Sequence, residues 1–181
     1  RTVVVQTGGA SGKLGPRHYQ LRPDSLPDLT QLFEELGSER PEGIVHAFAL
    51  SAPSSPENSE VGLAAGYFSV VALVQSLSTA GLLTLPMTVI TVGAVAARGK
   101  PSHPLSAMLC GLGKVLPVEY PELPFRQIDL ALHELATPDV LALLTSELAL
   151  PSSLPLVAFR AGERLHPVYE ALGEIEPQPL P

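Results

Sequence analysis

Four glycines lie close together near the start of the chain, in the stretch TGGASGKLG at residues 7–15. An apolar run at residues 2–5 precedes them, and a strand that leads into a glycine-rich turn is where many α/β enzymes hold the phosphates of a dinucleotide. That chemistry needs glycines for the tight turn and a helix whose N-terminus faces the phosphates. The candidate cofactor-binding residues are therefore Gly8, Gly9 and Gly12, with NADPH as the cofactor.

The sequence pattern lacks the helix that such a site requires. Residues 16–23 (PRHYQLRP) show no 3.6-residue apolar period and are predicted to contain a second strand. We therefore favour a turn between two strands over a phosphate cradle, and we assign no cofactor and no cofactor-binding residue. NADPH binding by Gly8, Gly9 and Gly12 stays open as the alternative.

A short-chain reductase also needs a proton donor, which is a tyrosine placed four residues before a lysine or an asparagine on one helical turn. The residues four positions after Tyr19, Tyr67, Tyr120 and Tyr169 are Pro23, Val71, Pro124 and Gly173. None of the four tyrosines fits, and the sequence predicts no catalytic residue.

Other chemistries find no better support. The five histidines are scattered, and His133-Glu134 lacks the second histidine of a zinc-protease helix, so no metal site is predicted. His46 lies in an apolar run and is interpreted as a core histidine, and Cys110 is expected to be an inert, buried thiol. No serine stands in a G-x-S-x-G motif. Candidate acid–base carboxylates, interpreted as solvated charges, are Glu57, Glu60, Glu119 and Glu122.

The elements that must position any such residues alternate between strand and helix. Strands are expected at residues 2–6, 19–21, 43–50, 87–92, 125–130, 156–160 and 164–169. Helices are expected at 24–36, 58–80, 103–116 and 138–148, the third being stopped by Pro117. The run at 43–50 is expected to be a central strand buried on both faces. This order predicts an α/β fold with a mostly parallel sheet and helices on both faces.

Composition and charge exclude several classes of partner. The net charge is −7 and basic residues do not cluster, so neither nucleic acid nor an anionic membrane is expected to bind. The most apolar stretch, residues 61–83, approaches transmembrane length but contains Tyr67 and Gln75, and we interpret it as a buried helix. A single cysteine and the lack of a signal peptide favour a cytoplasmic location.

The organisation of the chain suggests one domain followed by a short linker. Residues 1–173 are expected to form that domain, and the proline-rich residues 174–181 are expected to be a linker to a following domain. The chain begins almost inside a strand and without an initiator methionine. We therefore expect it to be a piece of a longer polypeptide.

Several segments resemble the structural subdomain of the ketoreductase or pseudo-ketoreductase region in modular type I polyketide synthases. The most specific are GLGKVLPVEYPELPFRQIDL at residues 111–130 and LVAFRAGER at 156–164, and nearly the whole chain takes part. GIVHAFAL at 43–50, ENSEVGLAAGYFSVVALVQSL at 57–77 and MTVITVGAVAARG at 87–99 are similar to the same family. In that family, two short-chain-reductase-like halves stand in tandem, and only the second holds NADPH.

The resemblance implies a truncated Rossmann-like, short-chain-reductase-like fold and a noncatalytic scaffold. Its expected partners are the catalytic half, neighbouring synthase domains and, indirectly, the acyl carrier protein. TGGASGKLG exceeds the reductase loop T-G-G-x-G-x-L-G by one residue, which would spoil a phosphate cradle. Two other functions remain open: a small stand-alone NADPH-dependent reductase, and a binding module that docks a partner on the face the second half would cover.

Overall fold

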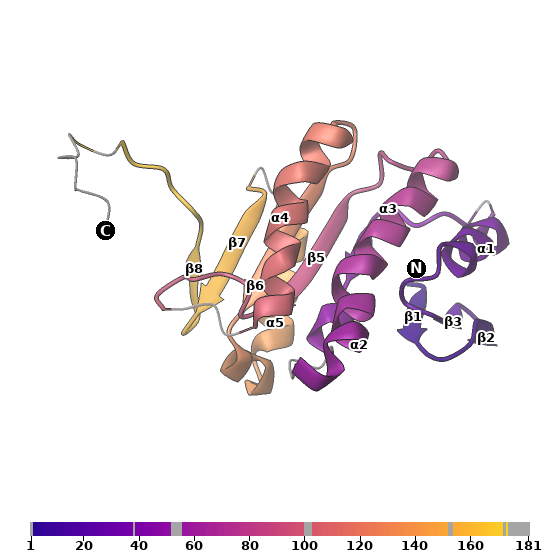
Figure 1. Ribbon diagram of the computed structural model, residues 1–181, viewed down its shortest axis with the longest axis horizontal. Coiled ribbons are helices and arrows are strands. Elements are labelled where there is room, and N and C mark those ends of the chain that lie inside the picture. Colours follow the sequence, from indigo (N-terminus) through magenta and orange to yellow (C-terminus); the bar gives the residue numbers. More distant parts are fainter. Residues whose placement is uncertain are drawn as a thin grey trace.

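The computed structural model describes residues 2–37, 39–51, 56–99, 103–151, 154–171 and 173. Within this part of the chain the strands form two sheets (Figure 1). A three-stranded sheet has the order β1-β3-β2, and a five-stranded sheet has the order β4-β5-β6-β7-β8. The linker expected at 174–181 lies outside the described residues, and the domain boundary at 173 stays a prediction.

The five-stranded sheet is parallel except at one edge. The parallel strands are β4 (Ile44–His46), β5 (Met87–Val92), β6 (Phe125–Leu130) and β7 (Leu156–Arg160). The last strand, β8 (Glu163–Leu165), returns antiparallel to β7. Ala161 and Gly162 form the turn with φ of 54° and 76°, the left-handed pair that a tight hairpin requires. The predicted mostly parallel sheet is confirmed.

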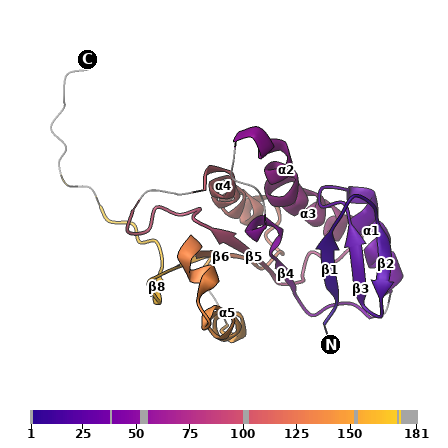
Figure 2. The same cartoon turned by 90° about the horizontal axis from the view of Figure 1, so that it is seen from below.

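Helices cover both faces of this sheet, as predicted (Figure 2). One face carries α2 (Ser59–Leu63), α3 (Ser69–Thr79) and α4 (Pro104–Glu119), and α5 (Val140–Ala149) covers the other. A π-helical segment, η3 (Ala64–Phe68), joins α2 to α3. Short 3-10 segments are η1 (Phe48–Leu50), η2 (Pro56–Asn58) and η4 (Leu132–Ala136).

The three-stranded sheet and the first helix form the N-terminal part of the fold. β1 (Val4–Thr7) runs parallel to β3 (His18–Leu21), and β2 (Gly12–Gly15) runs antiparallel to β3. α1 (Leu26–Leu36) begins after Ser25, whose hydroxyl accepts from the Asp28 amide at 3.3 Å. The helix predicted at 24–36 is confirmed, and it begins at Leu26, two residues later than expected.

Two hydrophobic clusters make up the core. The larger one joins both sheets, because Tyr19, Leu21 and Leu29 pack in the same cluster as Leu77 and Val89. The smaller one lies between α5 and the central strands. The apolar helix at Ser59–Thr79 is long enough to span a membrane, but half of its most apolar window is buried inside the fold. That is the pattern of a core helix, as the sequence indicated.

The expectation for residues 43–50 is wrong. β4 is a three-residue edge strand, and the chain then turns into the 3-10 segment η1. Among the described residues no strand pairs with its outer edge, because β1 pairs with β3 instead of β4. The side chain of Val45 is consequently 51% exposed, where a central strand would have buried it.

Two further expectations need correction. Pro117 does not stop α4, which continues to Glu119. Proline loses the hydrogen bond to the carbonyl four residues earlier, and in the last turn that loss is small enough to tolerate. The stretch TGGASGKLG is more than a turn, because its second half is β2.

Candidate functional site

The glycine-rich stretch joins two strands of the small sheet. The Gly8 amide donates to the Leu21 carbonyl at 2.9 Å, and Gly12 pairs with Gln20. None of Gly8, Gly9 and Gly12 has a positive φ. A Cβ on Gly8 would lie 2.2 Å from the Gln20 side chain, whereas Gly9 and Gly12 face open space. This stretch therefore opens onto β2 and lacks a helix N-terminus at its end.

The first helix N-terminus after this stretch is occupied by the chain itself. Asp28 in the first turn of α1 accepts from the Arg22 amide at 3.1 Å and from its guanidinium at 3.0 and 2.6 Å. The guanidinium of Arg22 holds the pKa of this carboxyl well below its usual range. An anion at this helix start would meet a carboxylate already in place. The assignment of no cofactor-binding residue stays a prediction.

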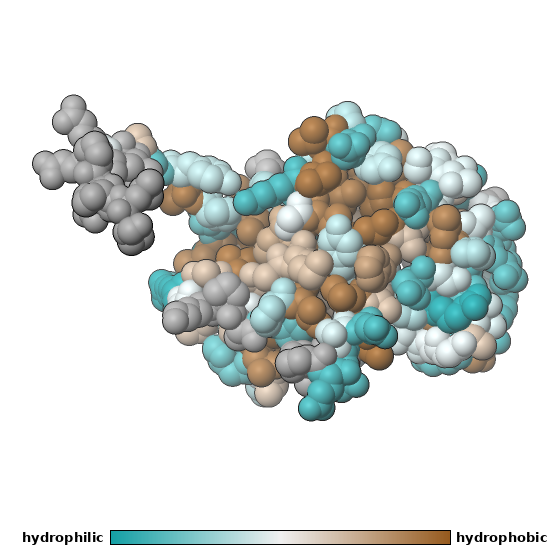
Figure 3. Space-filling view, in the orientation of Figure 1, coloured by the Kyte–Doolittle hydropathy of each residue, from teal (hydrophilic) through white to brown (hydrophobic). Residues whose placement is uncertain are grey.

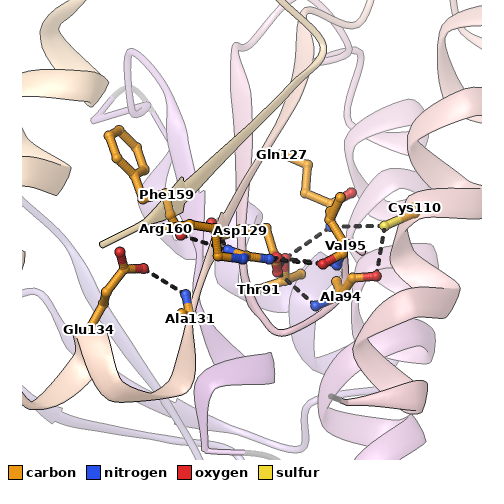
Figure 4. Close-up of polar contacts among 10 residues, drawn as sticks. All are labelled: Thr91, Ala94, Val95, Cys110, Gln127, Asp129, Ala131, Glu134, Phe159 and Arg160. Atoms are coloured by element: carbon orange, nitrogen blue, oxygen red, sulfur yellow. Dashed lines mark hydrogen bonds and ion pairs between the residues drawn. The ribbon is translucent and has the colours of Figure 1, made fainter. Parts of the chain in front are cut away.

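In an α/β fold, ligands bind at the carboxyl ends of the parallel strands. In this chain that region is filled by a buried ion pair (Figure 4). Asp129, at the end of β6, is completely buried. Its carboxylate accepts from Thr91 Oγ1 at 2.7 Å, the Ala94 amide at 2.9 Å, the Val95 amide at 3.2 Å and the Arg160 guanidinium at 2.5 Å.

Arg160, the last residue of β7, closes the cluster from the other side. Its side chain is 12% exposed and also donates to the carbonyls of Val95 at 2.9 Å and Phe159 at 2.7 Å. Figure 4 shows Asp129 and Arg160 pointing toward each other across the strand ends. We call Thr91, Ala94, Val95, Asp129 and Arg160 the Asp129 cluster. It fixes the loop after β5 against the two neighbouring strands.

A second layer of polar contacts leads from this cluster to α4. Gln127 Nε2 donates to Thr91 Oγ1 at 2.9 Å and lies 3.5 Å from Cys110 Sγ. Burial raises the pKa of the Cys110 thiol, which keeps it protonated at neutral pH. The thiol is only half-buried, where a buried thiol was expected, and its raised pKa disfavours the reactive thiolate.

Glu134 ties the neighbouring 3-10 segment to the β7–β8 turn. Its buried carboxylate accepts from the Ala131 amide at 2.7 Å and from the Gly162 amide at 3.3 Å. Arg164 of β8 makes a two-bond ion pair with the buried Glu147 of α5, at 2.7 and 2.9 Å. Glu147 is held by an arginine and Glu134 by main-chain amides, so both buried carboxylates hold elements together.

His46 lies in the core, as its apolar surroundings indicated. Its Nε2 is 2.8 Å from Ser69 Oγ, and that hydroxyl donates to the Ala65 carbonyl at 2.6 Å. Because the hydroxyl proton is given to a carbonyl, the imidazole donates through Nε2. Burial lowers the pKa of His46 to about 4, which leaves the ring neutral at pH 7. Its Nδ1 has no hydrogen-bond partner among the described residues, so the histidine is only half satisfied.

The remaining candidates do not converge. Glu57, Glu60, Glu119 and Glu122 are all exposed. Within the described residues, no group of three or more histidine, cysteine or acidic side chains could hold a metal ion. The structure therefore brings none of the carboxylates and histidines predicted as candidates into one site.

Sequence reasoning missed the Asp129 cluster. Its one local signal is a charged residue at or next to the end of each strand, Asp129 in FRQIDL and Arg160 in LVAFR. A buried charge needs a partner, so each of these strands called for one. Which residue supplies it depends on neighbouring strands that are 31 positions apart in sequence.

Apolar side chains are exposed on the helices that cover one face of the five-stranded sheet (Figure 3). On α4 an exposed stripe follows the helical period and includes Met108, Val115 and Val118. Gly111 lies within the same stripe, and a Cβ there would meet open space. Exposed residues of the neighbouring helix add Val61 and Phe68.

The sequence model of one protein family matches most of the chain. The family is described as beta-ketoacyl synthase-like, N-terminal, and its match covers residues 1–147. No curated protein matches the chain.

Ketoreductase regions are among the solved structures that match. The adenylation, ketoreductase and pseudo Asub multidomain structure of a keto acid-selecting NRPS module has a TM-score of 0.77 and 21% identity. An A-type ketoreductase from a modular polyketide synthase has a TM-score of 0.61 and 30% identity, and a C2-type ketoreductase from such a synthase has 0.64 and 27%.

These matches cover most of this chain but only part of the others. They include 90%, 84% and 88% of this chain, and 14%, 32% and 36% of the three solved chains, respectively. The chain thus spans well under half the length of each. At 21% identity the first match shows the fold alone.

Proposed function

The chain belongs to the beta-ketoacyl synthase-like N-terminal family, and on this premise we propose that it is the noncatalytic structural half of a polyketide synthase ketoreductase. It is a ketoreductase-related domain. In the proposed role it packs on a separate catalytic half of the same polypeptide, which binds NADPH and reduces the β-ketoacyl chain. It thereby positions that half against neighbouring synthase domains and, indirectly, the acyl carrier protein, in the cytoplasm.

The exposed apolar face on α4 is the observation that carries this proposal. Met108, Val115 and Val118 are each 44% or more exposed, on one side of a helix whose opposite side is buried in the core. A contiguous apolar patch on a protein surface marks an interaction site. Gly111 in the middle of the stripe lets a partner helix approach closely. Figure 3 shows this face as a broad apolar area.

The Asp129 cluster supports the noncatalytic part of the proposal. A reductase of this fold would hold its substrate and nicotinamide at the carboxyl ends of the strands. Here the Asp129 carboxylate receives four donors and is fully buried, so a substrate would meet no free acid or base from it. The loop that could open a pocket is held down by the same carboxylate.

Docking is tested by co-expressing this chain with the ketoreductase catalytic half encoded in the same gene and isolating the complex through a tag on one partner. We expect the two to co-purify. Met108→Asp combined with Val115→Asp should abolish the complex, because charges would enter an apolar interface. Leu141→Asp on α5 places the same charge on an exposed leucine of the opposite face and should leave the complex intact. Equal yields from both variants would contradict the proposal.

The noncatalytic role is tested by titrating the isolated chain with NADPH and following nucleotide fluorescence. We expect no saturable change and no ketone reduction. Binding that is lost in a Gly8→Ala, Gly12→Ala double variant would favour the stand-alone reductase. Because a Cβ on Gly8 would lie 2.2 Å from the Gln20 side chain, a loss of binding counts only if the double variant unfolds at the same temperature as the parent chain.

A further inference from the structure

The free edge of β1 carries main-chain groups that have no partner in the described part of the chain. The Val4 amide donates to the Arg17 carbonyl and the Gly8 amide to the Leu21 carbonyl, both at 2.9 Å, so even-numbered residues of this segment bond to β3. In a parallel ladder, successive residues direct their N–H and C=O groups to opposite sides. The main-chain groups of Val5 therefore point away from β3.

The free edge of β4 repeats this arrangement. The Ile44 amide donates to the Pro86 carbonyl at 2.8 Å, on the side of β5. The main-chain groups of the next residue, Val45, point outward. Among the described residues, neither Val5 nor Val45 has a main-chain hydrogen bond on its outward side. Figure 2 shows β1 beside β4, with β3 and β2 beyond it, so the two bare edges face each other.

A slot separates the two edges. A hollow of about 170 Å³ opens toward the helices, and a second of about 740 Å³ opens toward the surface. Val3 and Val5 on one wall and Gly43 and Val45 on the other line both hollows. The space therefore extends between the strands from one face of the sheets to the other.

The two mouths of the slot differ in chemistry. The smaller hollow is lined by Leu29, Phe33 and Phe48, and is apolar. The larger one is rimmed by charged residues of both signs, which are Arg17, Glu39, Arg40 and Glu42. A molecule that fills the slot thus meets an apolar surface on one side and a polar surface on the other.

The unpaired strand edges favour an extended peptide over a small molecule as the occupant of the slot. An apolar small molecule would fill the space but leave the N–H and C=O groups of both edges without partners. An extended peptide carries donors and acceptors along both of its edges, so it can bond to β1 and β4 together and join the two sheets. Its side chains alternate between the faces, which suits one apolar and one polar mouth.

We propose that the slot between β1 and β4 receives one extended peptide strand, with alternating apolar and polar side chains, from outside these 181 residues. The two modular polyketide synthase ketoreductases described above leave room for such a segment, because this chain spans only 32% and 36% of them. The inference goes beyond the proposed function. Docking on α4 does not need the slot, so either proposal can fail alone.

The test uses an acetylated, fluorescein-labelled nonapeptide of sequence KTVTVTVTK. We expect saturable binding by anisotropy. We also expect exchange of the Val5 and Val45 amides to slow at least about tenfold, with no change at Val4 and Ile44. Slow exchange of Val5 and Val45 before peptide is added would mean that the edges pair directly, and would overturn the proposal. So would binding without a change at these two amides.

Two controls isolate the main-chain bonds. N-methylating the valine amides of the peptide blocks one of its edges and N-methylating the threonine amides blocks the other, and each should weaken binding by at least about tenfold. No loss with either peptide would overturn the proposal. Val45→Pro removes the outward N–H and should weaken binding likewise, whereas Val45→Thr keeps it and should bind normally. If the proline variant fails to fold, the methylated peptides carry the test.

Discussion

At the residue scale, the buried charges bond to one another and to the main chain. Asp129→Asn keeps the size of the side chain but removes the charge that Arg160 needs, and we expect a loss of about 3 kcal/mol in the free energy of unfolding. Glu163→Gln breaks the exposed pair with Arg98 and should cost less than about 1 kcal/mol. Urea unfolding at neutral pH measures both. Equal losses would show that the Asp129 cluster is not the clamp described above.

His46 makes stability depend on pH. Its folded pKa of about 4 lies below the ordinary value of 6.5, so between these values the unfolded chain binds a proton that the folded chain does not. Stability should therefore fall by about 1.4 kcal/mol per pH unit as pH drops from 6.5 to 4. The contribution is fully present above pH 6.5. His46→Asn should remove this part of the slope in urea titrations, and an unchanged slope would contradict the assigned neutral imidazole.

For single residues, the sequence predicts burial better than it predicts which side chains pair. Cys110, which was expected to be buried, is only half-buried. That His46 would be buried follows from the apolar residues around it. The pairing of Asp129 with Arg160 does not, because it forms between strands whose order the local pattern leaves open. Gly8, Gly9 and Gly12 could be placed in a loop, but β2 could not be foreseen, since GKLG has neither the length nor the composition of a typical strand.

At the element scale, α1 depends on its first turn. Ser25→Ala removes the hydroxyl that accepts from the Asp28 amide, and we expect the free energy of unfolding to fall by about 1 kcal/mol. Ser146→Ala, an exposed change inside α5, should cause no loss because alanine favours the helix. Thermal unfolding of the two variants side by side measures the difference. A matching loss in both would argue against the cap.

Elements with strong local signals were predicted well. The apolar spacing of Leu29, Leu32 and Leu36 predicts α1, and these three residues are buried as expected. β4 was misjudged because its burial depends on whether another strand pairs with its outer edge, which is a property of the sheet. The end of α4 was misjudged because Pro117 lies in the final turn, where a missing hydrogen bond costs little.

At the scale of the whole molecule, two sheets share one core. Leu21 of β3 is 2% exposed and packs in the same cluster as Val89 of β5. Leu21→Ala should therefore destabilise the entire chain by about 3 kcal/mol. Hydrogen exchange should report the same loss at slowly exchanging amides of both sheets. Loss confined to the small sheet would show that it unfolds separately.

The resemblance stated from sequence motifs is confirmed by the family match and by the ketoreductase structures. The α/β architecture could be derived from the alternation of strands and helices alone. The separation into two sheets could not, because it depends on β1 pairing with β3. The scaffold role stays a proposal, since it concerns a partner outside these 181 residues.

The Asp129–Arg160 pair also bears on how the carboxyl end of the sheet can be changed. Removing either charge strands the other in a dry interior, whereas replacing both with apolar residues can be neutral. Asp129 and Arg160 lie on different strands, so no single mutation can reopen the carboxyl end of the sheet without a penalty. Changing the chemistry at this end of the sheet while keeping the fold stable therefore takes two coordinated substitutions, one on β6 and one on β7.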